Sequence, residues 1–133
     1  MRAIVVDDEN NVRQALTKLI KTFCPEVEVV GEADSVESAS SLIEQTDFEL
    51  AFLDIQLQDG TSIDLLHRFP DRNFHFIFVT AFDQYAVDAF RLSAIDYLLK
   101  PVSPDLLQLA IEKAKKVSTQ EENDITLSVA KDH

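Results

Sequence analysis

The chain has 133 residues, the size of a single domain, and 46% of them are hydrophobic. Its formal net charge of −12 argues against direct binding to nucleic acid, because attraction to phosphates needs a basic surface. No apolar run is long enough to span a membrane. The single cysteine, Cys24, precludes an internal disulfide and fits a reducing, cytoplasmic compartment.

Short apolar runs along the chain predict the strands of a sheet. Four of them are typical of strands buried on both faces of a parallel sheet: residues 3–6, 50–53, 76–79 and 97–99. A fifth run, residues 27–30, includes Glu28, so we expect it to be more exposed and to lie at an edge of the sheet.

The segments between these runs have the period of amphipathic helices. Ser35 is predicted to cap the second helix, and Ser103 and Pro104 are predicted at the N-cap and first positions of the fifth. Strand and helix alternate five times, which predicts an α/β fold with a doubly wound, flavodoxin-like, five-stranded parallel sheet. The apolar stripes place the helices around residues 12–20, 36–43, 61–68, 85–90 and 106–114.

Each of the four buried runs ends in a polar group. Asp7 and Asp8 follow the first run, and Asp54 follows the second. Thr80 follows the third, and Lys100 follows the fourth. In open α/β sheets the ligand site lies beyond the carboxyl ends of the strands, so we expect these side chains to meet at one edge. Together they suit the binding of a divalent cation and a phosphoryl group.

The residue types indicate how such a site would work. Asp7, Asp8 and Asp54 form an oxygen-rich pocket for Mg²⁺ or Mn²⁺, whose charge would relieve the repulsion among the carboxylates. Asp54 stands alone at the end of the predicted central strand, so it is the best candidate for a nucleophile that forms an acyl phosphate. Lys100 and Thr80 are suited to bind the phosphoryl oxygens.

Each of these residues also has a simpler interpretation. Asp8 could cap the helix that begins near Asn10, and Asp54 could be a turn residue. Thr80 could be an ordinary hydroxyl at a strand end, and Lys100-Pro101 could be part of a loop. The functional interpretation is favoured because all of them fall at strand ends on the same predicted edge.

Four motifs occur in this order along the chain: Asp7-Asp8, Asp54, Thr80-Ala81 and Lys100-Pro101. In these motifs and their order, the sequence resembles the receiver domain of two-component response regulators. The resemblance covers residues 2 to about 117. It implies that Asp54 accepts a phosphoryl group from a sensor histidine kinase, as in a phosphorelay. It also implies that the domain catalyses its own phosphorylation and a slow hydrolysis.

The resemblance assigns a role to each site residue. Asp8 and Asp54 would ligate Mg²⁺ directly, with the backbone carbonyl of Gln56 as a third ligand. Asp7 would act mainly through bound water.

Further roles follow for the other side of the site. Lys100 would pair with the phosphoryl group, and the bond before Pro101 would be cis. Thr80 and Tyr97 match the switch pair of the family, in which Thr80 moves to the phosphoryl group and Tyr97 turns inward behind it.

Two longer segments, residues 80–90 and 94–102, are similar to receivers attached to LytTR-type DNA-binding domains. After the receiver domain, residues 1–117, we expect an acidic linker or tail over residues 118–133. Residues 125–129 alternate like the start of another strand, so they are the expected entry to an output domain, through which alone DNA would be bound.

Two further expectations concern the output surface of the domain and the lifetime of its phosphorylated form. The resemblance implies homodimerisation through the fourth helix, fifth strand and fifth helix, residues about 84–116. Gln56 and Phe82 flank the expected path of the hydrolytic water: the amide of Gln56 could orient this water, whereas the ring of Phe82 could exclude it. Phe82 could instead pack on the neighbouring loop or face a dimer partner. Many receivers carry a proline in the loop after Asp54, but residues 56–60 have none, although Gly60 can supply a positive φ.

Alternative functions are weighed against this one. A stand-alone receiver or phosphate shuttle is the alternative if no output domain follows. An aspartyl phosphatase of the haloacid dehalogenase type uses similar residues, but it needs an acid two residues after the nucleophile, where this chain has Gln56. A pseudo-receiver with an inactive site is disfavoured because the full set of site residues is present.

Overall fold

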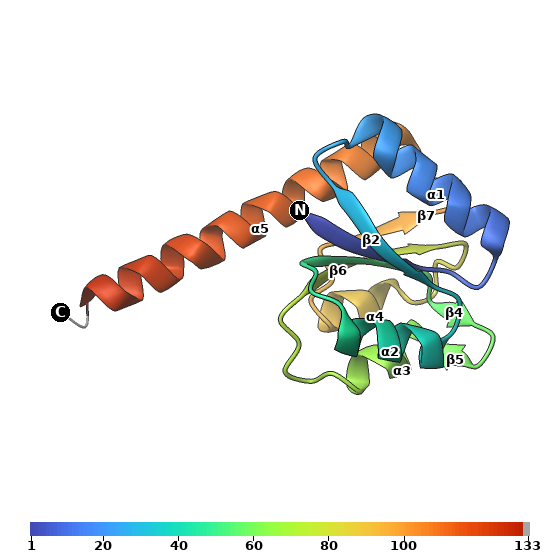
Figure 1. Cartoon of the computed structure of the whole chain (residues 1–133), viewed down its shortest axis with the longest axis horizontal. Coiled ribbons are helices and arrows are strands. Elements are labelled where there is room, and N and C mark those ends of the chain that lie inside the picture. The colour runs from blue at the N-terminus through green and yellow to red at the C-terminus, as the bar shows by residue number, and fades with distance from the viewer. Residues whose placement is uncertain (132–133) are drawn as a thin grey trace.

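The computed structural model describes the backbone of residues 1–131 and the side chains of residues 1–121. A parallel sheet of five strands forms its centre, with the order β2-β1-β3-β6-β7 (Figure 1). The predicted fold is confirmed, and β3 is the central strand. The strands are β1 (Arg2–Val6), β2 (Glu28–Ala33), β3 (Leu50–Leu53), β6 (His75–Thr80) and β7 (Asp96–Leu99).

Helices cover both faces of this sheet, as expected for a doubly wound fold (Figure 1). Helices α1 (Asn10–Phe23) and α5 (Pro104–Lys131) pack on one face. Helices α2 (Val36–Gln45), α3 (Ser62–His67) and α4 (Ala86–Arg91) pack on the other. In the part of the chain that the structure describes, no helix is both long and apolar enough to cross a membrane.

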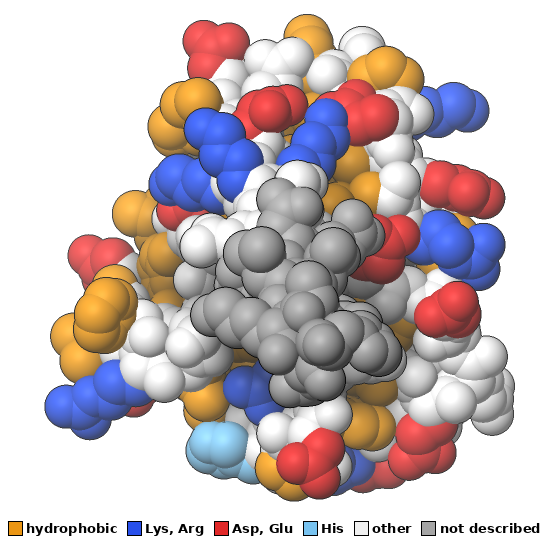
Figure 2. Space-filling view, turned by 90° about the vertical axis from the view of Figure 1, so that its left-hand side faces the viewer, with side chains coloured by type: hydrophobic (Ala, Val, Ile, Leu, Met, Phe, Trp, Pro, Cys, Tyr) orange, Lys and Arg blue, Asp and Glu red, His pale blue; other side chains and the backbone are white. Residues whose placement is uncertain are grey.

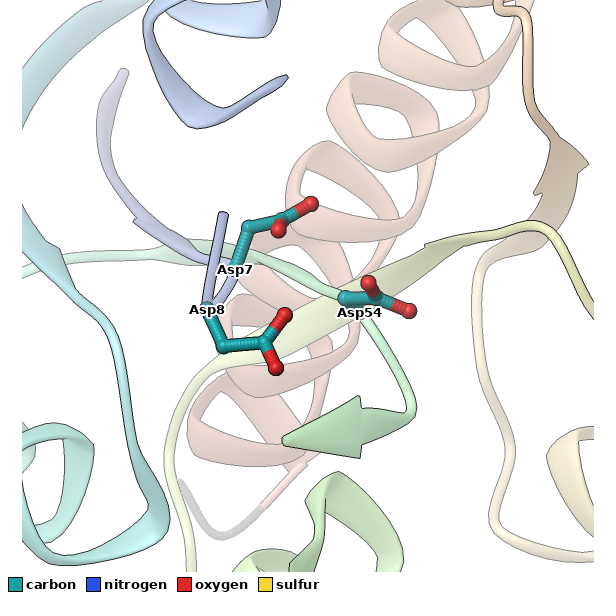
Figure 3. A group of neighbouring side chains, drawn as sticks. All are labelled: Asp7, Asp8 and Asp54. Carbon is teal, nitrogen blue, oxygen red and sulfur yellow. The ribbon is translucent and has the colours of Figure 1, made fainter. Parts of the chain in front are cut away.

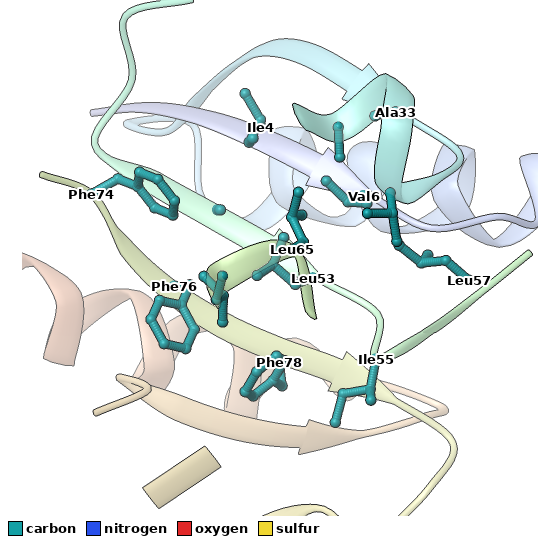
Figure 4. Packing of buried hydrophobic residues seen from close by; sticks show 14 of the residues in the cluster. Ile4, Val6, Ala33, Leu53, Ile55, Leu57, Leu65, Phe74, Phe76 and Phe78 are labelled. Atoms are coloured by element: carbon teal, nitrogen blue, oxygen red, sulfur yellow. The ribbon is translucent and has the colours of Figure 1, made fainter. Parts of the chain in front are cut away.

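Alternation along the strands divides the core into two clusters, one on each face of the sheet. In β1, Ile4 and Val6 belong to one cluster, whereas Ala3 and Val5 belong to the other. This follows from the two-residue period of a strand. Figure 4 shows the first cluster, in which Phe78 and its neighbours are buried beneath α2, α3 and α4. Each large side chain buried in this way contributes about 1.5–3 kcal/mol of hydrophobic free energy.

The helix starts follow the predicted capping. The hydroxyl of Ser35 accepts the backbone N–H of Ser38 at 3.0 Å, and the hydroxyl of Ser103 accepts that of Leu106 at 3.2 Å. Helix α5 begins at Pro104, as predicted.

Strand β2 lies at an edge of the sheet, as predicted, but it continues to Ala33. The sequence pattern missed this extension because Gly31 and Glu32 interrupt the apolar run. Gly31 packs closely against α2: a Cβ atom at this position would lie 2.7 Å from Cδ1 of Leu42, so that side chain would have to shift. The glycine therefore lets α2 approach the strand closely.

The last helix is longer than predicted, since α5 runs to Lys131. Residues 125–129 are helical, so the expectation of strand-like backbone there is wrong. No glycine or proline interrupts residues 105–131, and helical hydrogen bonding can therefore continue beyond the packed part of the helix. Residues 132–133, the end of the expected linker or tail, lie outside the described residues.

The distal part of α5 extends away from the sheet (Figure 1). Figure 2 views the molecule from this side, which is the side of the strands' amino ends, and acidic, basic and hydrophobic side chains are interspersed over its visible part. The carboxyl ends of the strands, where the polar residues gather, lie at the opposite edge.

Candidate functional site

Three carboxylates meet at the carboxyl edge of the sheet (Figure 3). Asp7 and Asp8 follow β1, and Asp54 follows β3, which pairs with β1 along its whole length. One oxygen from each carboxylate lies within 4.8 Å of the others. Asp7 and Asp54 are buried, with relative exposures of 2% and 8%, so their charges are poorly screened by solvent.

Both oxygens of Asp7 are already occupied. Oδ1 accepts the backbone N–H of Glu9 at 2.9 Å, and Oδ2 accepts the ammonium group of Lys100 at 2.7 Å. The N-cap of α1 is Glu9, which makes no side-chain cap. The simpler interpretation of Asp8 as the cap of this helix is therefore contradicted.

The remaining carboxylate oxygens form an acceptor-rich pocket. Burial raises the pKa of Asp8 above its ordinary value, and repulsion from Asp7 and Asp54 raises it further. Oδ1 of Asp54 is buried and accepts no hydrogen bond from the described residues. Such an atom is costly without a partner. The donor set and the orphaned oxygen fit a hard divalent cation.

Lys100 reaches this pocket from the end of β7. Its Nζ atom lies 2.9 Å from Oδ2 of Asp54, in addition to its contact with Asp7. Burial alone would lower the pKa of Lys100, but the hydrogen bonds to the two carboxylates outweigh burial and raise it. The bond between Lys100 and Pro101 is cis, in agreement with the resemblance.

Thr80 and Tyr97 are connected through the loop that follows β6. The buried hydroxyl of Thr80 accepts the backbone N–H of Phe82 at 3.4 Å, and the hydroxyl of Tyr97 donates to the carbonyl of the same residue. The ring of Tyr97 packs inward against Phe78, with ring centroids 6.1 Å apart. Burial raises the pKa of Tyr97, so its hydroxyl stays protonated as a donor.

The two residues expected beside the water path have different surroundings. Gln56 is exposed, and its side-chain amide donates to the hydroxyl of Tyr85 at 3.0 Å. Phe82 is half-buried, and its backbone N–H and carbonyl make the contacts to Thr80 and Tyr97. The roles of Gln56 and Phe82 in hydrolysis stay predictions.

The loop after Asp54 is a small hairpin, β4 (Gln56–Leu57) paired with β5 (Gly60–Thr61). Its Asp59 carboxylate accepts the backbone N–H groups of Val36 and Glu37, at 2.7 and 3.1 Å, and so caps α2 from outside the helix. Gly60 has a φ of 152°, which confirms the predicted positive φ. Gln58 and Asp59 form its two-residue connection, because Gly60 already pairs with Leu57.

Ser62 also supports the site and carried no sequence signal. It is fully buried, and its hydroxyl donates to the backbone carbonyl of Asp54. Its backbone N–H donates to the carbonyl of Ile55 at 2.8 Å. The segment that carries Asp54 is therefore fixed by α3 as well as by its own strand.

In a doubly wound α/β domain the ligand site lies at the carboxyl edge of the sheet, and in this chain that edge carries clustered carboxylates, a hydroxyl and a lysine. The family model of the response regulator receiver domain matches residues 3–112, so the chain belongs to this family.

Several known proteins are similar to the chain. A response regulatory protein of Vibrio parahaemolyticus is 40% identical over 121 residues, which are 90% of this chain and 50% of the relative. The sensory transduction protein LytT of Enterococcus faecalis is 39% identical over 118 residues, 87% of this chain and 48% of LytT. The chain thus spans about half the length of these curated relatives.

Among solved structures, the response regulatory domain of protein mrkE from Klebsiella pneumoniae is similar, with a TM-score of 0.77 and 30% identity. The match covers 92% of this chain and 99% of that one. Receiver domains of two-component systems partner with sensor histidine kinases and generally bind Mg²⁺ at an acidic pocket, and this chain has such a pocket. Relatives named LytT and LytR are consistent with the LytTR-type subfamily.

Proposed function

We propose that this chain is the phosphorylation-activated receiver of a two-component system and that Asp54 accepts a phosphoryl group from the phosphohistidine of a sensor kinase. One observation carries the proposal. Asp54 directly follows the central strand, with one oxygen paired to Lys100, while its other oxygen is orphaned in the pocket that it shares with Asp8.

The pocket fits Mg²⁺, and Mn²⁺ would be accepted as a substitute. Asp8, Asp54 and the backbone carbonyl of Gln56 would hold the ion. Asp7 would act mainly through water, because both of its oxygens already have hydrogen-bond donors. When bound, the ion supplies positive charge beside the phosphoryl oxygens.

In phosphoryl transfer, one carboxylate oxygen of Asp54 forms a bond to phosphorus as the phosphorus–nitrogen bond to the kinase histidine breaks. The electron pair of that bond returns to the imidazole nitrogen. Lys100 neutralises charge on the phosphoryl oxygens, and Thr80 would turn to donate its hydroxyl hydrogen to one of them. Catalysis is thus positioning and charge neutralisation by groups that the fold already holds.

The signal passes from Thr80 to the loop after β6. When its hydroxyl turns to the phosphoryl group, the N–H of Phe82 loses its acceptor, and the loop that carries Phe82 can shift. Tyr97 holds the carbonyl of the same residue, so it responds to this shift from β7. Thr80 therefore makes different contacts in the two states, as a switch requires.

Homodimerisation through α4, β7 and α5 is part of the proposal. Among the described residues, six large hydrophobic side chains are exposed. All but Phe23 lie on these three elements, and a group of exposed apolar side chains is typical of an interaction surface. These side chains are Val87, Phe90, Leu99, Leu106 and Leu109.

The output is proposed from the relatives. Since the chain spans about half of LytT, we propose that residues 118–133 connect the receiver to a LytTR-type DNA-binding domain in a cytoplasmic transcription regulator. DNA would be bound only through that domain. A stand-alone receiver or phosphate shuttle is the second candidate.

The test of receiver activity is the intact mass of the purified chain after incubation with a small acyl phosphate. We expect the mass of one phosphoryl group to be added when Mg²⁺ is present and none when the metal is chelated. No added mass in the presence of Mg²⁺, from either the small donor or a phosphorylated kinase, would contradict the proposal.

A further inference from the structure

A hydrogen bond links two loops at the carboxyl edge of the sheet. The side-chain amide of Gln56 donates to the hydroxyl of Tyr85 at 3.0 Å. Gln56 lies in the segment that leaves β3, and Tyr85 lies in the segment that leaves β6. Because β3 and β6 are neighbours in the sheet, this bond joins the two segments that begin at Asp54 and Thr80.

Tyr85 is the fixed partner in this bond. It is the N-cap residue of α4, its carbonyl accepts the N–H of Ala89 at 2.9 Å, and its ring packs against the core cluster beneath this face. Its hydroxyl therefore has a defined position.

Gln56 has a fixed backbone but an adaptable side chain. Its backbone belongs to the β4–β5 hairpin, which the carboxylate of Asp59 ties to α2. Its carboxamide is exposed and would otherwise be free to sample several rotamers.

We propose that Tyr85 is a positioning residue that holds the carboxamide of Gln56 away from the hydrolytic water and thereby lengthens the life of the phosphorylated form. The inference rests on the proposed phosphorylation of Asp54. In hydrolysis a water oxygen bonds to phosphorus, the bond from phosphorus to the Asp54 carboxylate breaks, and the electron pair returns to that carboxylate. Both water protons leave with the phosphate as dihydrogen phosphate.

The water must approach in line with the breaking bond, and an amide that orients it would speed the reaction. Gln56 is placed two residues after the acceptor and carries such an amide. While one of its amide N–H groups donates to Tyr85, the carboxamide of Gln56 is tethered and is not free to swing toward the water. Gln56 thus has one side-chain arrangement in which hydrolysis is slow and another in which it is fast, and the hydrogen bond to Tyr85 favours the first.

The test is a double-mutant cycle on phosphate loss from purified phosphoprotein at fixed Mg²⁺ and pH. Tyr85→Phe keeps the ring and removes the acceptor oxygen. We expect it to speed hydrolysis about threefold to tenfold, the range given by one hydrogen bond. In a Gln56→Ala background, Tyr85→Phe should leave the rate unchanged, because the amide that it releases is gone.

Gln58→Ala is the matched control, because Gln58 is exposed on the same hairpin and the structure shows no hydrogen bond of its side chain to the described residues. We expect its rate to equal that of the unmodified chain, and the unfolding midpoints of all variants should agree. Two results would overturn this inference but leave the proposed function intact. One is that Tyr85→Phe speeds hydrolysis equally in the unmodified and the Gln56→Ala backgrounds, and the other is that it does not speed hydrolysis at all. Failure of the unmodified chain to accept a phosphoryl group would overturn the proposed function as well.

Discussion

The Nζ atom of Lys100 lies 2.9 Å from Oδ2 of Asp54, although 46 positions separate the two residues in the chain. Strand β6 stands between their strands in the sheet, so the lysine must extend across the end of β6, where Thr80 is buried. The Asp54 carboxylate, the Thr80 hydroxyl and the Lys100 ammonium group thus lie at the carboxyl ends of three adjacent strands, β3, β6 and β7. If Asp54 is the acceptor, as proposed, its phosphorylation would occur beside the strand end that carries Thr80.

Asp8→Asn should have opposite effects on stability and on metal binding. Burial and the neighbouring carboxylates raise the pKa of Asp8, which means that its negative charge destabilises the fold at neutral pH. Removing that charge should stabilise the metal-free chain and weaken Mg²⁺ binding at least about tenfold. Thermal unfolding with and without Mg²⁺, together with a metal titration, measures both effects.

Asp71→Asn is the control for this variant, because Asp71 is exposed and remote from the pocket in the sequence. It should change neither quantity. Unchanged Mg²⁺ affinity in Asp8→Asn would move the direct ligand role to Asp7.

Asp59→Asn should weaken the hairpin that carries Gln56 in a manner that depends on pH. The hydrogen bond from the backbone N–H of Val36 lowers the pKa of Asp59 from 3.8, and the bond from Glu37 lowers it further. A lowered pKa means that the ionised carboxylate stabilises the fold above the unfolded pKa and that this stabilisation is lost as the pH falls through the folded pKa. Urea unfolding midpoints should differ between the two proteins at neutral pH and converge in acid.

Some elements of this structure could be predicted from the sequence and others could not. Burial on both faces of the sheet requires continuous apolar runs, so β1, β3 and β6 could be located from the sequence. The run at residues 97–99 also marked β7, but the expectation that this strand is buried on both faces is wrong, because β7 lies at an edge of the sheet and Leu99 is 48% exposed. The central position of β3 and the edge position of β2 were predicted as well. The meeting of Asp7, Asp8, Asp54 and Lys100 followed from their shared position at the carboxyl ends of parallel strands.

Other features depend on packing that no sequence period encodes. Strand β2 extends through Gly31 by pairing with β1, and α5 continues past its packed part without an apolar stripe to mark its end. The contact between Gln56 and Tyr85 joins two loops 29 positions apart. Its geometry depends on how the β4–β5 hairpin and α4 are each anchored.

Phe82→Ala tests whether the Phe82 ring shields the phosphoryl group. A half-buried ring without hydrogen-bonding atoms should exclude water, so its removal should shorten the life of the phosphorylated form. Phe82→Glu should shorten it further, because a carboxylate can hold the attacking water. The rate of phosphate loss is the measurement, and an unchanged rate in Phe82→Ala would instead assign the ring to packing or to partner contact.

Phosphorylation should promote dimers through the face formed by α4, β7 and α5. Light scattering should show an increase in mass when beryllofluoride, a mimic of the phosphoryl group, is added with Mg²⁺. Phe90→Ala should weaken this dimer, because the Phe90 ring is 84% exposed on α4. Phe23→Ala removes a ring that is 42% exposed on α1 and should have no effect. If mass is unchanged by the mimic in both this domain and the full-length protein, the dimer proposal fails.

The central claim is that Asp54 is the phosphoryl acceptor, and Asp54→Asn tests it most directly. The unmodified chain, treated with a small acyl phosphate and Mg²⁺, should gain the mass of one phosphoryl group, and hydroxylamine should remove it because the product is an acyl phosphate. Asp54→Asn should gain no mass under the same conditions, since an amide cannot form this bond. Equal labelling of Asp54→Asn and the unmodified chain would contradict the account.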